Sequence, residues 1–208
     1  MINRLFAQRV LLVSLVAGAS YMLPVLAHWE GPAIIAWKGL GVGLLALYAA
    51  LSSGHRDVRH IALVMALGAA GDVVLDIAFV GGAALFALGH LVAIQLYWRN
   101  RRAGRGGADQ LIALGLLLAI PMIAFLISHR PDVAGYAAVL AAMAATAWRS
   151  NFPRHHVALG ALLFAISDLL IFARMGPLSG SVLPHLLVWP LYYAGQALIA
   201  TGVVRARA

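Results

Sequence analysis

GDVVLDIAFVGGAALFALGH, residues 71–90, contains the features that decide the fold. Apart from Asp72, Asp76 and His90, every residue in this stretch is apolar or glycine. The VGG at 80–82 separates two apolar runs, as a turn between helices does. Two carboxylates four residues apart, followed by an imidazole, are costly in such surroundings and therefore indicate a function.

The rest of the chain is equally apolar. Its 208 residues are 63% hydrophobic and only 11% charged, and the mean hydropathy is +0.91. A soluble domain of this length could not bury so much apolar surface, so a lipid bilayer is expected to be the solvent for most of it. The absence of cysteine excludes disulfides, thiolate metal ligands and cysteine nucleophiles.

Eight apolar runs lie between polar breaks, and a membrane span needs about 20 mostly apolar residues. The runs are 10–27, 33–51, 61–79, 82–98, 110–127, 133–148, 157–174 and 182–203. The loops between them are short and leave no room for a soluble domain. We therefore predict an all-α polytopic membrane protein, a bundle of eight transmembrane helices that forms a single domain over residues 1–208.

The basic residues support this count. In an eight-span chain, twelve of the fifteen fall on one side: Arg4, Arg9, Arg56, Arg59, Arg99, Arg101, Arg102, Arg105, Arg149, Arg154, Arg205 and Arg207. Only Lys38, Arg130 and Arg174 lie on or toward the other side of the membrane. This asymmetry predicts both termini in the cytoplasm and fits a bacterial inner membrane. The net charge of +8 is thus read as a topological signal, without a nucleic-acid partner.

The first span also resembles a cleavable signal sequence. A basic start and an apolar stretch precede Val25-Leu26-Ala27, which is similar to a small-residue cleavage site. Cleavage would leave seven spans and destroy the charge asymmetry, so we expect the span to be retained.

The ionisable residues within the spans are few: Lys38, Asp72, Asp76, His90, Asp168, Arg174 and His185. Helix rise places Asp72, His90 and Asp168 near the midplane and Asp76 one turn farther out. Two deep carboxyl groups with few cations nearby do not both stay charged. One protonated and one ionised carboxyl group is the usual arrangement for acid/base chemistry. Asp76 could instead serve only in interhelical hydrogen bonding, and Arg174 and His185 could be interfacial.

Three segments, of which the stretch 71–90 is the first, follow a family pattern. GDVVLDIAFVGGAALFALGH, GALLFAISDLLIFAR and YYAGQALIATG resemble, in this order, elements of the YhhN-like lysoplasmalogenase family of integral membrane proteins. The resemblance runs from Lys38 to the last span. The chain departs from the pattern at Gly39, where a proline is expected, and at Leu91-Val92-Ala93, where a tyrosine is usual.

The resemblance implies hydrolysis of the vinyl ether bond of a lysoplasmalogen, a lysophospholipid held among membrane lipids. The products are a fatty aldehyde and glycerophosphoethanolamine or glycerophosphocholine. Such cleavage needs a proton donor and a base that orients water, and no cofactor. We assign Asp72 and Asp168 as the acid/base pair, in either order. The supporting or substrate-binding residues are then His90, Lys38, Asp76, Ser167, Tyr193 and Gln196, with Tyr193 and Gln196 lining the pocket. No metal is assigned, and the oligomeric state is left open.

Three alternatives remain at this stage. Asp72, His90, Asp168 and His185 could ligate a metal in an intramembrane lipid hydrolase, although the spans contain no closely spaced histidine pair. Intramembrane acids also occur in proton-coupled transporters. A purely structural membrane protein is the third class, and the clustering of acids at one depth argues against it.

Overall fold

The computed structural model describes residues 2–102 and 106–207. Apart from one isolated bridge between Arg101 and Ser150, these residues contain no β-structure. Their helices are α1 (Ile2–Ser20), α2 (Met22–Ala27), α3 (Pro32–Ser52), α4 (Arg56–Leu75), α5 (Phe79–Arg99), α6 (Gly107–Ser128), α7 (Pro131–Arg149), a π-helical turn (Arg154–Ala158), α8 (Leu159–Arg174) and α9 (Leu183–Arg207). The prediction of an all-α polytopic membrane protein is confirmed.

Each predicted span corresponds to a helical segment. Among the described residues, seven segments are long and apolar enough to cross a membrane, and α1 with α2 forms the first of them. Pro24 lacks the amide that would bond one turn back, which accounts for the short break at Tyr21. The seventh predicted span, α7, has 19 residues but does not meet the same criterion, so its crossing stays a prediction.

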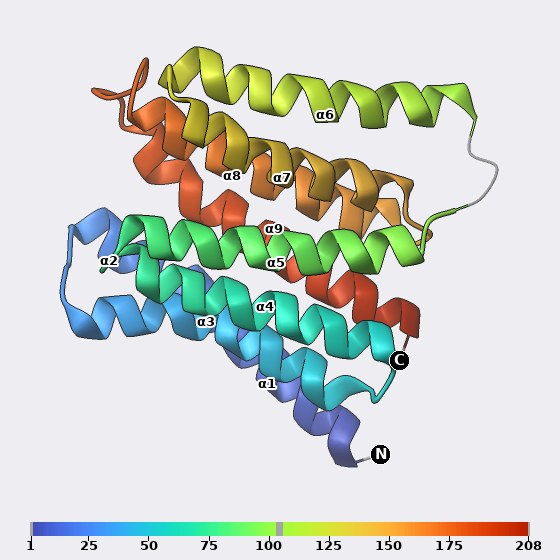
Figure 1. The fold of residues 1–208 in the computed structure, drawn as a ribbon. Coiled ribbons are helices and arrows are strands. Elements are labelled where there is room, and N and C mark those ends of the chain that lie inside the picture. Colours follow the sequence, from blue (N-terminus) through green and yellow to red (C-terminus); the bar gives the residue numbers. More distant parts are fainter. Residues whose placement is uncertain (1, 103–105, 208) are drawn as a thin grey trace.

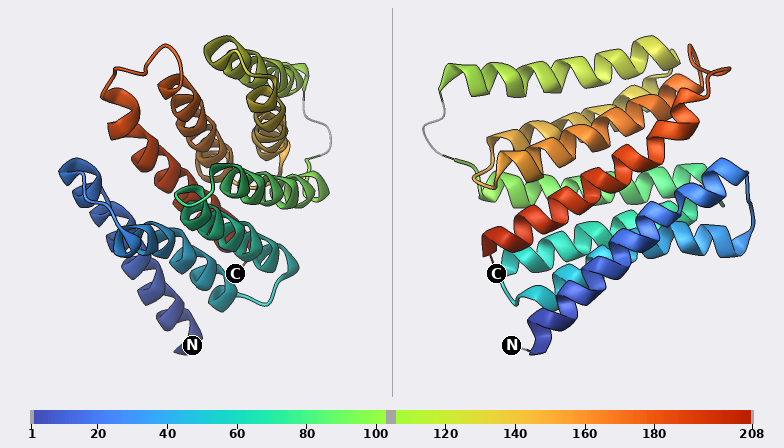
Figure 2. Two further views of the ribbon diagram at one scale, coloured as in Figure 1. Left: turned by 60° about the vertical axis from the view of Figure 1, so that its left-hand side comes forward. Right: turned by 180° about the vertical axis from the view of Figure 1, so that it is seen from behind.

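The helices form two groups joined by the C-terminal helix. α1, α3, α4 and α5 contact one another in sequence, and α6, α7 and α8 form the second group. α9 contacts α3 and α4 on one side and α8 on the other, and so lies between the groups (Figures 1 and 2). α5 and α7 also touch, and they diverge toward the end of the bundle away from the termini.

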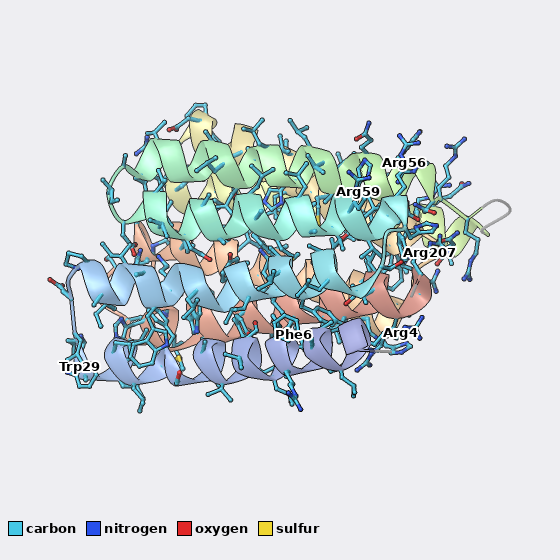
Figure 3. All side chains as sticks on the ribbon, turned by 90° about the horizontal axis from the view of Figure 1, so that it is seen from below. Arg4, Phe6, Trp29, Arg56, Arg59 and Arg207 are labelled. Atoms are coloured by element: carbon cyan, nitrogen blue, oxygen red, sulfur yellow. The ribbon has the colours of Figure 1, made fainter. Side chains whose placement is uncertain are left out.

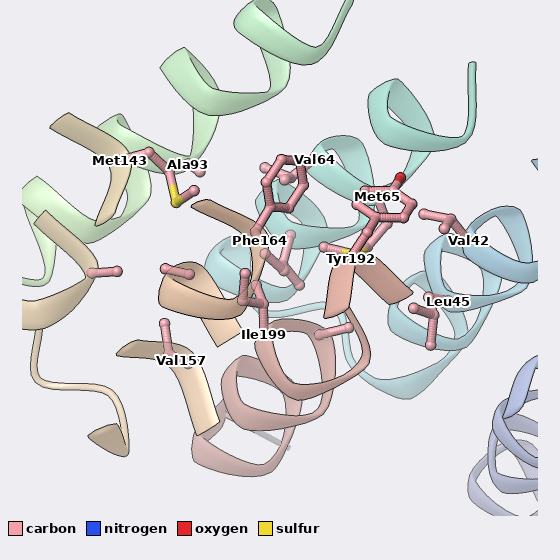
Figure 4. Close-up of a cluster of buried hydrophobic side chains, with 14 of the residues drawn as sticks. Val42, Leu45, Val64, Met65, Ala93, Met143, Val157, Phe164, Tyr192 and Ile199 are labelled. Atoms are coloured by element: carbon pink, nitrogen blue, oxygen red, sulfur yellow. The ribbon is translucent and has the colours of Figure 1, made fainter. Parts of the chain in front are cut away.

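Two glycines let α8 and α9 cross closely. A Cβ atom on Gly160 would lie 2.6 Å from the carbonyl oxygen of Gly195, and one on Gly195 would lie 2.7 Å from the carbonyl oxygen of Gly160. Such small-residue contacts allow membrane helices to approach backbone to backbone. Around this crossing, Phe164, Tyr192 and Ile199 pack into the buried apolar cluster shown in Figure 4.

The charges are distributed unequally between the two ends of the bundle. Figure 3 shows Arg4, Arg56, Arg59 and Arg207 at one end and Trp29 at the other. Both termini lie at the arginine-rich end (Figure 1), as an even number of crossings requires. Arg105 lies outside the described residues. That this end faces the cytoplasm remains a prediction from the positive-inside rule.

A buried carboxylate joins three helices at the arginine-rich end. Asp57, in the first turn of α4, is only 4% exposed. It accepts hydrogen bonds from Arg99 at the end of α5 and, at 2.9 Å, from Nε of Arg207 in the last turn of α9. Arg207 also donates to the side chain of Asn100 at 2.7 Å. The carboxylate of Asp57 thus balances the charges of Arg99 and Arg207, and these contacts hold α9 against α4 and α5.

We predict that Asp57→Asn destabilises the fold, because two arginines would lose their buried counter-charge. The thermal unfolding midpoint in detergent, followed by intrinsic fluorescence, should fall by about 5 °C or more. Asp132→Asn is the matched control, since it breaks an ion pair whose side chains are 59% and 64% exposed. It should change the midpoint little. Equal shifts of the unfolding midpoint in the two variants would show that the Asp57 ion pairs stabilise the fold no more than an exposed ion pair does.

Candidate active site

A cavity of about 710 Å³ lies between the two helix groups. It is lined by residues of α3, α4, α5, α7, α8 and α9, and its walls are mostly apolar. Its polar lining consists of Lys38, Asp72, Arg130, Asp132, Tyr136, Ser167, Asp168, Trp189 and Tyr192. A mostly apolar cavity of this size with a few converging polar groups is typical of a small-molecule site.

The cavity occupies the half of the bundle away from the termini. On α5 its wall runs from Phe79, the first residue of the helix, to Ala87, a rise of about 12 Å. On α8 it runs from Ser167 to Met175, just past the last helical residue. The cavity therefore extends from the end of the bundle opposite the arginines to about the middle of the helices, where α5 and α7 have converged (Figure 1).

Asp72 contributes the first buried carboxyl group. It is 2% exposed, and its Oδ2 accepts a hydrogen bond from the Tyr192 hydroxyl of α9 at 2.8 Å. The side-chain amide of Gln196, one turn along α9, donates to the same hydroxyl at 3.3 Å. α4 ends at Leu75, four residues before the predicted end of this span, so Asp72 lies in the last turn of its helix.

Asp168 contributes the second buried carboxyl group. It is 7% exposed, and its Oδ2 accepts a hydrogen bond from the Tyr136 hydroxyl of α7 at 2.7 Å. His90 of α5 is 3.2 Å from that hydroxyl through Nε2. With the tyrosine proton directed to Asp168, Nε2–H of His90 is the donor in this contact. His90 itself packs edge-on against Phe164 and reaches the carboxyl group only through Tyr136.

The two carboxyl groups therefore share one pattern of hydrogen bonds. Each accepts from a tyrosine, and each tyrosine hydroxyl has a second nitrogen partner. Within residues 2–102 and 106–207, neither carboxyl group forms an ion pair. Charging both in one largely apolar cavity would be costly, so this pair is suited to share one negative charge.

Lys38 and Asp76 lie toward the outer rim of the cavity and form an ion pair with each other. The Lys38 ammonium contacts Oδ1 of Asp76 at 2.8 Å, and Asp76 is the residue that follows the last helical residue of α4. Ser167 lines the cavity, but its hydroxyl donates to the Val188 carbonyl at 2.9 Å and so joins α8 to α9.

Two predicted lining residues lie elsewhere. Tyr193 points toward α1, where its hydroxyl is 2.8 Å from that of Ser14, and Tyr192 lines the cavity in its place. Adjacent helical residues differ by about 100° in direction, so only one of the two tyrosines can face the cavity. Gln196 lies behind Tyr192 and outside the cavity lining.

Tyr136 is a site residue that the sequence reasoning missed. It is the only Phe, Tyr or Trp between Phe125 and Trp148. The sequence did offer a signal for it, namely an isolated tyrosine in the alanine-rich segment before Trp148. A phenol hydroxyl at membrane depth requires a hydrogen-bond partner, so this tyrosine indicates a buried polar contact.

The proposed metal ligands do not gather in the structure. His185 contacts the backbone carbonyl of Val25 at 2.8 Å and stacks on His28, away from the cavity. No group of three or more His, Asp or Glu side chains within the described residues could hold a metal ion. The arrangement of Asp72, His90 and Asp168 instead gives two carboxyl–tyrosine pairs.

Comparison with known proteins agrees with the resemblance seen in the sequence. A model of the YhhN family matches residues 33–203, a range that includes every cavity-lining polar residue named above. The chain belongs to the YhhN family. A human protein, lysoplasmalogenase TMEM86B, is 32% identical over an alignment of 166 residues that covers 74% of this chain. The matched region spans 66% of the human protein's length. No solved structure matches this YhhN protein.

We predict that Asp72→Asn and Asp168→Asn leave the fold intact, in contrast to Asp57→Asn. Asparagine keeps an oxygen that can accept the tyrosine hydrogen bond and removes a carboxyl group that lacks a cationic partner. Thermal unfolding midpoints in detergent should equal or exceed that of the unmodified protein. Losses as large as that of Asp57→Asn would assign the two carboxyl groups a structural role.

Proposed function

We propose that this YhhN protein is a lysoplasmalogenase that hydrolyses the vinyl ether bond of lysoplasmalogen by carboxyl-based acid/base catalysis. The observation on which the proposal depends is the pair of buried, tyrosine-bound carboxyl groups, Asp72 and Asp168, in one mostly apolar cavity. The human relative, named a lysoplasmalogenase, supports the same activity. The proposed location is the inner membrane of a bacterium, with both termini in the cytoplasm.

The chemistry needs one proton donor and one base. Protonation of the alkene carbon that does not bear oxygen converts the vinyl ether to an oxocarbenium ion. Water then adds to the oxygen-bearing carbon and loses a proton, giving a hemiacetal. Collapse of the hemiacetal breaks the carbon–oxygen bond and yields a fatty aldehyde and the glycerol hydroxyl. In the proposal, one carboxyl group donates the first proton and the other, as carboxylate, accepts the proton of water.

The surroundings of the two carboxyl groups suit these roles. A carboxylate close to the oxocarbenium ion stabilises its positive charge, and it does so more strongly where water is scarce. Each tyrosine binds Oδ2 of its aspartate. No hydrogen bond to Oδ1 of Asp72 or Asp168 occurs within the described part of the chain, which leaves that oxygen for proton transfer. Tyr136 and Tyr192 are thus positioning residues.

The apolar wall fits the hydrocarbon part of the substrate. Between the two carboxyl groups and the outer end of the bundle, α5 contributes Phe79, Val80, Ala83, Ala84 and Ala87, and α8 contributes Ile171 and Phe172. The small alanines leave room for the alkenyl chain to turn at the carboxyl groups and lie back along α5, opposite the glycerol part of the substrate.

We expect Asp72→Asn and Asp168→Asn each to abolish aldehyde release from lysoplasmalogen by the purified protein in detergent, because neither variant retains an acid/base pair. The residual rate should be at least about a hundredfold lower. Full activity in either variant would contradict the assignment. Activity that is lost on chelation and restored by zinc would favour the metal-dependent alternative.

Tyr192 and Tyr193 form a matched pair for the positioning role. Tyr192→Phe removes the donor to Asp72 and should lower kcat by about tenfold or more, with KM little changed. Tyr193→Phe removes an equivalent hydroxyl that contacts Ser14 instead, and kcat should stay within about twofold of the unmodified value. Initial rates of aldehyde release over a range of substrate concentrations measure both constants. Equal effects of the two changes would show that the hydroxyl on Asp72 has no special role.

A further inference from the structure

We propose that the outer rim of the cavity is a binding site for a zwitterionic phosphoester head group. The rim consists of Lys38, Arg130 and Asp132, which line the cavity, and of Asp76, which is bound to Lys38, so that two ion pairs, Lys38–Asp76 and Arg130–Asp132, meet there. The phosphate would bind the two cations, and the ammonium group would bind the two carboxylates. This inference rests on the proposed function, because it names the part of the substrate that the rim recognises.

The Arg130–Asp132 pair has the geometry of a site that can exchange partners. Arg130 immediately precedes α7 and donates through Nε and Nη2 to the two carboxylate oxygens of Asp132, at 3.1 and 2.6 Å. Both side chains are more than half exposed, and both line the cavity. Exposed ion pairs contribute little to stability, so a phosphate can replace the carboxylate on Arg130 at small cost. The planar guanidinium binds phosphate as readily as carboxylate.

The Lys38–Asp76 pair lies on the facing side of the rim. Lys38 comes from α3 and lines the cavity, and its side chain is less exposed than that of Asp76, 15% against 35%. The early end of α4 at Leu75 places Asp76 beyond the helix, where it holds the lysine at the cavity edge. The rim thus presents a cation and an anion from each side.

The depth of the rim relative to the buried carboxyl groups matches the substrate. Arg130 lies just before α7, and Tyr136, which binds Asp168, lies six residues later, a rise of about 9 Å. In a lysoplasmalogen, about seven bonds separate the phosphorus from the alkene carbon that is protonated, and an extended chain of that length spans about 8 Å. A phosphate at Arg130 therefore places the alkene at the depth of Asp168.

The charge balance of this end favours a zwitterion over an anion. Apart from the buried Asp72 and Asp168, the end of the bundle away from the termini has three acidic residues, Glu30, Asp76 and Asp132. They equal in number its three basic residues, Lys38, Arg130 and Arg174. The opposite end has the large excess of arginine. A head group that adds one positive and one negative charge leaves the balanced rim neutral, whereas an added anion would leave it with unpaired negative charge.

Binding of saturated alkyl ethers tests the proposal without catalysis, since they lack the alkene that is protonated. Isothermal titration of the purified full chain in detergent would measure Kd for 1-alkyl-glycerophosphoethanolamine, 1-alkyl-glycerophosphate and 1-alkylglycerol with the same chain. Arg130→Gln should raise Kd about tenfold for the two phosphoesters and leave alkylglycerol unchanged. Asp132→Asn should raise Kd only for the ethanolamine compound. Arg174→Gln, which removes an exposed arginine at the same end but outside the cavity lining, is the control and should change none.

The outcomes separate this inference from the proposed function. Unchanged phosphoester affinities in Arg130→Gln, or equal changes for all three ethers, would overturn the head-group site whether or not the protein hydrolyses lysoplasmalogen. Selective loss of phosphoester binding in Arg130→Gln would support the head-group site even if no aldehyde is released from lysoplasmalogen. That result would support the lipid-binding site and reject the proposed hydrolase activity.

Discussion

The rest of the site depends on one constraint: a carboxyl group inside a lipid-surrounded bundle must have hydrogen-bond partners, because water is not available to supply them. Asp72 and Asp168 meet this constraint through one tyrosine each, from α9 and α7. One contact joins α4 to α9, far along the sequence, and the other joins the successive helices α7 and α8, and together they set the two carboxyl groups around one cavity. A cationic partner would have fixed both groups as carboxylates, whereas a phenol permits either protonation state.

The packing of the helix backbones also positions the cavity and its polar groups. The glycine contact between α8 and α9 brings Asp168 and Tyr192 onto adjacent helices at the cavity floor. Residues of α5 and α7, which diverge toward the outer end (Figure 1), line the cavity between this floor and that end. At the opposite end, Asp57 binds Arg99 and Arg207 and holds α4, α5 and α9 together. The charged cluster at one end is thus a structural anchor, and the mostly apolar cavity at the other end is available for a ligand.

Much of this could be predicted from the sequence, because the bilayer imposes simple rules. Hydropathy and arginine asymmetry located all eight helices, and the cost of buried charge singled out Asp72 and Asp168. What could not be predicted depends on helix rotation and helix ends. Tyr192 and Tyr193 are adjacent in sequence, and only packing decides which faces the cavity. Tyr136 carries no charge, so the cost of buried charge did not mark it. The end of α4 at Leu75 depends on the turn into α5 rather than on any charged residue.

The roles of Asp72, Asp76 and Asp168 differ with their depth in the bundle. Asp76 follows Asp72 by four residues and keeps helical backbone angles, so both side chains leave α4 on one face, one turn apart. The outer of the two, Asp76, forms an ion pair with Lys38, whereas Asp72 lines the cavity with Asp168. A paired, more exposed carboxylate beside a cation is fitted to bind charge, and a buried one without an ion-pair partner is fitted to exchange a proton. One turn of helix therefore separates a binding role from a chemical one.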